Sequence, residues 1–122
     1  MPNTQQVEVP HAEISPRIDA DGVIHWYKGD TFKLDFTIQL LTDDDPPQEI
    51  PLQDGDVVRF TFRDYRTRVA EFVFDTFPDG VVTLTFDAEM TAKFCRGEYT
   101  YDVTHERNYI RTIIKDNRAV VE

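Results

Sequence analysis

Few residues of this chain have the types and the spacing that catalysis or metal binding requires. Ser15 is the only serine, and it lies in a proline-containing segment that would have to cross the core to form a Ser-His-Asp triad. His11, His25 and His105 lie far apart, without the His-x-His or His-x-x-x-His spacing of a metal site. We expect Cys95, the single cysteine, to be a small buried side chain rather than a nucleophile. The sequence thus predicts no enzyme, no cofactor and no metal site.

Three adjacent carboxylates are the remaining candidate for binding an ion. Asp43, Asp44 and Asp45 could attract Ca²⁺, but an EF-hand loop spreads its ligands over about twelve residues, with a central glycine and a final glutamate. That spacing is absent from residues 42–55. We therefore favour a solvated loop over a metal site.

The overall charge restricts the partners that we expect. The chain has 122 residues, 23 of them acidic and 13 basic, which gives a net charge of -10. Nucleic acid and anionic membranes both need a clustered positive surface, so we expect neither as a partner. No apolar run is long enough for a transmembrane helix, and the polar first ten residues do not predict a signal peptide. The single cysteine fits synthesis in a reducing cytoplasm.

Alternating apolar and polar residues indicate strands. Apolar side chains stand at every second position of residues 32–41, as a strand with one buried face requires. A helix with this spacing would scatter the same side chains around its circumference. The alternation recurs in residues 57–63, 70–74, 82–86 and 98–106.

The segments between these strands supply turns and one helical turn. Asp87 has the residue type of an N-cap, and Gly97 has that of a helix stop. Asp116 and Asn117 both tolerate left-handed backbone, so we expect a hairpin turn there before a last strand at 119–121. The pattern predicts an all-β fold, an antiparallel sandwich or barrel of about seven to eight strands, over residues 22–122.

Residues 1–21 are expected to form an extended N-terminal arm. Pro2 and Pro10 stand there among polar residues, and proline disfavours regular structure. Val7, Val9 and Ile14 are the apolar side chains with which such an arm would contact a neighbour. That neighbour is either an assembly partner or the chain's own domain, and the sequence leaves both readings open.

Basic and aromatic side chains complete the candidate contact residues. Arg59 and Arg63 lie on one predicted strand, and Arg111 and Arg118 lie along the last hairpin. On an acidic chain they could dock on acidic patches of neighbouring copies or partners, although a solvated sheet face explains each of them singly. Trp26 is a further candidate, and if it were exposed beside a tyrosine it could form a sugar-binding strip. The tyrosines in question are Tyr27, Tyr65 and Tyr109.

Short motifs along the chain resemble known β-sandwich domains. The segment C-R-G-E-Y-T-Y is similar to the D-x-G-x-Y-x-C corner of immunoglobulin-like sandwiches at Gly97 and Tyr99, whereas Cys95 and Tyr101 depart from it. Over residues 23–121 the chain resembles the N-terminal immunoglobulin-like domain of phage baseplate upper proteins and related virion proteins. The motifs are Y-K-G-D-T-F-K-L-D-F, E-I-P-L-Q-D-G-D-V-V-R-F-T-F-R-D, G-E-Y-T-Y-D-V and Y-I-R-T-I-I-K-D-N-R-A-V-V.

This resemblance implies a non-enzymatic immunoglobulin-like β-sandwich that attaches parts of a tailed-phage particle to each other. The chain would be a tail or baseplate adaptor or a capsid decoration subunit, made in the host cytoplasm and located in the virion. Its partners would be other virion proteins or further copies of itself. The alternative that we keep is a carbohydrate-binding or receptor-binding module.

Overall fold

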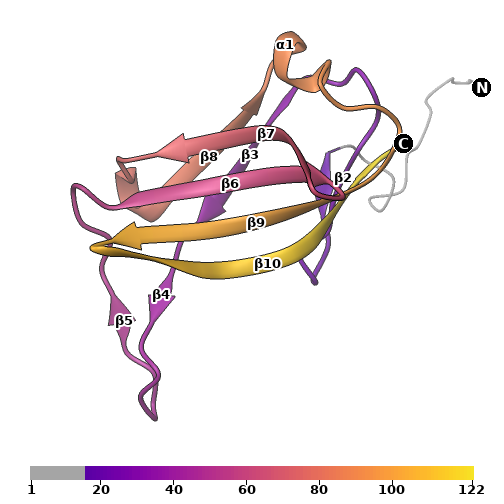
Figure 1. The fold of residues 1–122 in the computed structure, drawn as a ribbon. Coiled ribbons are helices and arrows are strands. Elements are labelled where there is room, and N and C mark those ends of the chain that lie inside the picture. The colour runs from indigo at the N-terminus through magenta and orange to yellow at the C-terminus, as the bar shows by residue number, and fades with distance from the viewer. Residues whose placement is uncertain (1–15) are drawn as a thin grey trace, which may run out of the picture.

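The computed structural model describes residues 16–122, which form a mostly β structure (Figure 1). The arm residues Val7, Val9 and Ile14 lie outside the described residues. The elements are β1 (Arg17–Ile18), β2 (Ile24–Trp26), β3 (Phe32–Thr37), β4 (Leu40–Leu41), β5 (Glu49–Ile50), β6 (Val57–Asp64), β7 (Thr67–Phe74), a 3₁₀ turn η2 (Pro78–Gly80), β8 (Val81–Phe86), the single helical turn α1 (Ala88–Thr91), β9 (Gly97–Arg107) and β10 (Tyr109–Val121).

One large sheet and two strand pairs make up this structure. The large sheet has the strand order β1-β2-β10-β9-β6-β7. The pair β3-β8 lies across one face of it, and the pair β4-β5 extends away from the body (Figure 1). All neighbouring strands are antiparallel except β2 and β10, which run parallel. This pairing departs from the all-antiparallel prediction, because β2 and β10 are far apart in sequence and no hairpin fixes their relative direction.

Aromatic side chains fill the space between the large sheet and β3-β8. Phe86 of β8 lies 5.9 Å from Phe62 of β6 between ring centroids, and Phe36 of β3 lies 5.0 Å from Phe60. Val58, Phe60 and Phe62 are all fully buried, as the alternation in 57–63 predicts. Burial of rings of this size is the main source of stability that the sequence pattern provides.

The predicted strand at 32–41 is divided into two strands in the structure. Residues Phe32–Thr37 pair with β8, and this pairing ends where Thr37 meets Val81, the first residue of β8. The chain then changes partner, and Leu40 pairs with Ile50 instead. The alternation runs through residues 32–41 without a break, but the neighbouring strand β8 begins only at Val81. The segment therefore forms two strands with different partners.

The predicted turn at Asp116 and Asn117 is a bulge within one long strand. The register with β9 shifts between Ile114 and Asn117, and Asp116 has a positive φ of 53°. The backbone N–H of Asp116 donates to Oδ1 of Asp102 at 2.8 Å, and the Asn117 amide donates to the backbone oxygen of Asp21. Of the two residues, Asp116 has the expected left-handed backbone, but it serves to bend β10 and not to reverse the chain.

The turn chemistry elsewhere follows the sequence more closely. Asp87 is the N-cap of α1, and its side chain accepts a hydrogen bond from the N–H of Met90 at 2.8 Å. Asn108 has a positive φ of 68° in the tight turn between β9 and β10. Cys95 is exposed, so the prediction of a buried thiol is wrong. It follows the helical turn in a connecting loop, where its neighbour Phe94 enters the core instead.

Candidate interaction surfaces

The outer face of the large sheet carries charges that pair within the chain. Arg59 of β6 forms an ion pair with Glu106 of β9 at 3.0 Å, and Arg63 pairs with Asp102 of the same strand. Arg118 of β10 pairs with Glu98 at 3.0 Å. Because these arginines already have acidic neighbours, docking on a partner through them would replace existing ion pairs at little net gain.

Trp26 does not belong to any surface. Only 1% of this residue is exposed, and its ring lies 5.1 Å from that of Phe86 and 5.2 Å from that of Phe94 between centroids. Because β2 pairs with β10 in the large sheet, its successive side chains point to opposite faces of that sheet. Ile24 and Trp26 therefore point into the core, and His25 points outward. The prediction that Trp26 contacts a partner is therefore wrong. A buried Trp26 also cannot form part of an exposed aromatic strip.

Tyr27 and Tyr109 cannot form such a strip either. Tyr27 follows the strand β2, which pairs with the last residues of β10, whereas Tyr109 is the first residue of β10. At about 3.3 Å per residue, the length of β10 separates the two tyrosines by roughly 30 Å or more.

Arg111 lies where the β9–β10 turn meets the base of the β4-β5 pair. Its guanidinium carbon stands 5.4 Å from the ring centroid of Tyr109, and its Nη2 donates to the Tyr109 hydroxyl at 3.0 Å. In the described part of the chain no carboxylate forms an ion pair with Arg111, in contrast to Arg59, Arg63 and Arg118. Of the four predicted arginines, this one keeps its charge available.

A small cavity of about 170 Å³ opens beside Arg111. Its lining comes from the β9–β10 turn and from the β4-β5 pair, and consists of Leu40, Ile50, His105, Arg107, Asn108, Tyr109 and Arg111. We call this cavity the notch. Arg107 is paired with the buried Asp56, so Arg111 is the side chain of this lining with which an anionic group could pair.

A buried carboxylate holds the wall of the notch in place. Asp56 is almost fully buried, and it accepts hydrogen bonds from Nε of Arg107 at 2.7 Å and from the N–H of Gln53 at 3.0 Å. Arg107 also donates to the backbone oxygen of Pro51, which fixes the loop before β6 against the end of β9. The Arg107 hydrogen bond holds the pKa of Asp56 far below its ordinary value, and the same contact raises the pKa of Arg107.

His105 is the unusual member of this group. Only 4% of it is exposed, and its Nε2 lies 3.2 Å from Oδ2 of Asp56. Neither ring nitrogen makes a well-directed hydrogen bond within residues 16–122. From the sequence we considered His105 only as a metal ligand, which the histidine spacing does not support, and we did not single out Asp56 or Arg107. No local signal connects them, because 51 positions separate Asp56 from Arg107.

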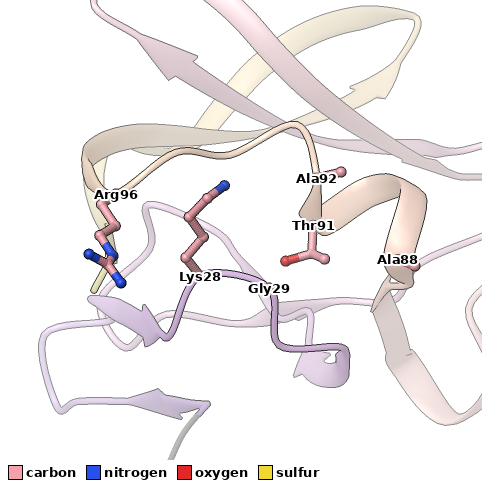
Figure 2. Close-up of a pocket in the computed structure, with 6 residues that line it drawn as sticks. All are labelled: Lys28, Gly29, Ala88, Thr91, Ala92 and Arg96. Carbon is pink, nitrogen blue, oxygen red and sulfur yellow. The ribbon is translucent and has the colours of Figure 1, made fainter.

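A larger and more open pocket lies at the opposite end of β9, next to α1. It measures about 500 Å³ and is lined by Lys28, Gly29, Ala88, Thr91, Ala92 and Arg96 (Figure 2). The Lys28 amine donates to the backbone oxygen of Phe94 at 3.1 Å, so Lys28 serves to fasten the loop after α1. Lys28 and Arg96 are the cations of this lining, and on so open a surface salt screens their attraction for an anion.

A third pocket, of about 470 Å³, combines an aromatic ring with carboxylates. Tyr65 is 94% exposed at the β6–β7 turn, where its φ is 56°. The lining also includes Asp64, Glu98 and Asp116. An exposed ring beside acidic hydrogen-bond acceptors is the arrangement that a sugar would need.

The comparisons with known proteins leave the family open. No protein-family profile, no curated protein and no solved structure matches this chain. Within residues 16–122, no helix is long and apolar enough to cross a bilayer. The same residues contain no group of three or more His, Cys, Asp or Glu side chains placed to hold a metal ion.

Proposed function

We propose that this chain is a non-enzymatic immunoglobulin-like β-sandwich that joins components of a tailed-phage particle. It acts by protein–protein contacts, as a tail or baseplate adaptor or as a capsid decoration subunit. The proposal rests on the motif resemblance given above and on two structural features, a tyrosine corner and an open sheet edge.

The tyrosine corner supports the immunoglobulin-like part of the proposal. The hydroxyl of Tyr99, near the start of β9, accepts a hydrogen bond from the N–H of Cys95 at 2.8 Å and donates to the Cys95 oxygen at 3.1 Å. A tyrosine that bonds back to the backbone a few residues upstream is a recurrent feature of these sandwiches. This contact of Tyr99 supports our interpretation of C-R-G-E-Y-T-Y as such a corner.

The open edge of β7 is the observation that carries the contact function. This strand of eight residues pairs with β6 on one side, and no described strand pairs with its other side. Five of its eight residues are apolar, and Val73 is half exposed on the outer face. An unpaired edge strand is a template on which a strand of another protein can add.

Co-sedimentation with phage particles tests this function. We expect the chain to sediment with tailed-phage particles of its own source, and Val73→Glu to reduce the bound fraction severalfold. Thr104→Glu is the matched control, because Thr104 and Val73 flank Arg59 from opposite sides on the same face, while Thr104 lies on an interior strand. A chain that binds no particle component, with or without residues 1–21, contradicts the proposal.

The alternative, a carbohydrate-binding or receptor-binding module, keeps one specific observation in its favour. The exposed ring of Tyr65 beside Asp64 and Glu98 provides the stacking surface and the acceptors that such a module uses. Binding on a glycan array that is lost in Tyr65→Ala would favour this alternative. Silence on the array would remove it.

A further inference from the structure

The end of the molecule at the notch presents two opposite charges next to each other. The β4-β5 pair extends beyond the body, and the β9–β10 turn lies at its base (Figure 1). The projecting loop carries Asp43, Asp44 and Asp45, all exposed, and we call these three residues the acidic tip. No lysine or arginine stands between positions 34 and 58 to neutralise them.

The acidic tip is held in a defined turn. The N–H of Thr42 donates to the Gln48 oxygen at 2.8 Å, and the Thr42 hydroxyl accepts a hydrogen bond from the Gln48 N–H at 2.9 Å. The N–H of Asp44 also points at this hydroxyl, at 3.4 Å. These bonds hold the loop that carries the three exposed carboxylates, with which an external cation or a basic surface can pair.

The notch supplies the opposite charge through Arg111. Arg111 has no ion pair in the described part of the chain, and it lines the notch beside the buried ring of His105, which faces Asp56. Tyr109, which also lines the notch, is 63% exposed. An unpaired arginine beside an exposed aromatic ring is a composition that protein contacts favour.

We propose that a second copy of this chain occupies the notch, by inserting its acidic tip there, and that the contact is reciprocal. A two-fold axis places the tip of each copy on the notch of the other, so one surface that carries both signs is complementary to itself. The exposed ring of each Tyr109 then lies at the contact. The inference deepens the proposed contact function and rests on it, but it uses a surface other than the edge of β7.

Charge reversal provides a sharp test, because two defective variants should repair each other. Sedimentation velocity of the full chain between about 1 and 200 μM should show a monomer–dimer equilibrium. Arg111→Glu should weaken dimerisation at least about tenfold, because both contacts of the dimer would then join an acidic tip to a glutamate. The triple variant Asp43→Lys, Asp44→Lys, Asp45→Lys should have the same effect, because both contacts would then join lysines to Arg111. In an equimolar mixture both contacts again join opposite charges, so the mixture should form a heterodimer.

Arg118→Glu is the matched control for Arg111→Glu, because Arg118 is an exposed arginine of the same strand and lies on the outer face. It should leave dimerisation unchanged. A wild-type chain that stays monomeric up to the highest concentration overturns the inference. The inference is also overturned if Arg111→Glu dimerises as strongly as wild type, or if the mixture of the two variants does not form heterodimers. The phage co-sedimentation experiment is scored separately through Val73, so a failed dimer leaves the proposed function standing.

Discussion

The two ends of β9 are stabilised by different physical means. At its start, Tyr99 packs edge-on against Phe94 at 5.0 Å, in a cluster of rings that includes Trp26 and Phe86. At its end, Arg107 holds the buried carboxylate of Asp56. The aromatic end depends on apolar burial, which has no preferred direction and does not depend on pH. The charged end depends on one directed ion pair, so its stability follows protonation.

This difference assigns a task to each end. Apolar packing tolerates small shifts, and it joins β2, β8 and the loop after α1 in one cluster. The bond from Arg107 to Asp56 and Pro51 instead fixes one loop against one strand. The charged end thereby sets the position of the notch beside it, and the aromatic end keeps the sheets together. Four measurements would test this division.

The largest expected effect belongs to Trp26→Ala, which removes the ring at the centre of the aromatic end. Truncation of a buried aromatic side chain costs about 3–5 kcal/mol of unfolding free energy. Urea denaturation followed by tyrosine fluorescence measures this loss. Ile110→Ala removes an exposed apolar side chain and should change stability by about 0.5 kcal/mol or less. A small loss in Trp26→Ala would mean that the aromatic end is not the main support.

Asp56→Ala should have the second largest effect, about 2–3 kcal/mol. It leaves the Arg107 guanidinium and the Gln53 N–H without their acceptor, and we set the value below that of a fully buried pair because Arg107 is partly exposed. A double-mutant cycle with Arg107→Leu isolates the pair. Additive losses in that cycle would show that the two side chains are not coupled.

The pH dependence of stability should distinguish the two ends. Because the folded-state pKa of Asp56 is depressed, its contribution is fully present above the ordinary carboxyl value of 3.8 and is lost as the pH falls through the depressed one. The advantage of wild type over Asp56→Asn should therefore become progressively smaller when denaturation is measured from pH 6 down to pH 2. The advantage of wild type over Trp26→Ala should stay constant over the same range.

The smallest effect is expected from Tyr99→Phe, which keeps the ring and deletes the hydroxyl. Loss of the two hydrogen bonds to Cys95 should cost about 1 kcal/mol. Thermal denaturation is sensitive enough to measure it. Tyr109→Phe, an exposed counterpart at the other end of β9, should leave the free energy of unfolding nearly unchanged.

The sequence predicts local features of this fold better than pairings between distant segments. Alternation correctly identifies Val58, Phe60 and Phe62 as buried, because the two-residue period of a strand is a local property. The N-cap at Asp87 is local as well. The parallel pairing of β2 with β10 is not, and without it the burial of Trp26 could not be predicted.

The candidate surface follows the same rule. The sequence identifies four basic side chains on an acidic chain, Arg59, Arg63, Arg111 and Arg118. Only the sheet register shows that, within residues 16–122, Arg111 lacks the acidic neighbour that each of the other three has. Glu106 and Asp102 reach Arg59 and Arg63 because β6 and β9 are neighbours. The contact of Asp56 with Arg107 likewise depends on how the end of β9 meets the loop before β6, which no short-range pattern encodes.

The parallel pairing of β2 with β10 has a consequence for synthesis on the ribosome. Ile24 and His25 leave the exit tunnel early, yet their neighbours Ala119 and Val120 are translated about 95 residues later. Closure of so long a loop comes late in folding. A nascent chain thus keeps the β10 side of its tryptophan strand unpaired until the last strand has emerged.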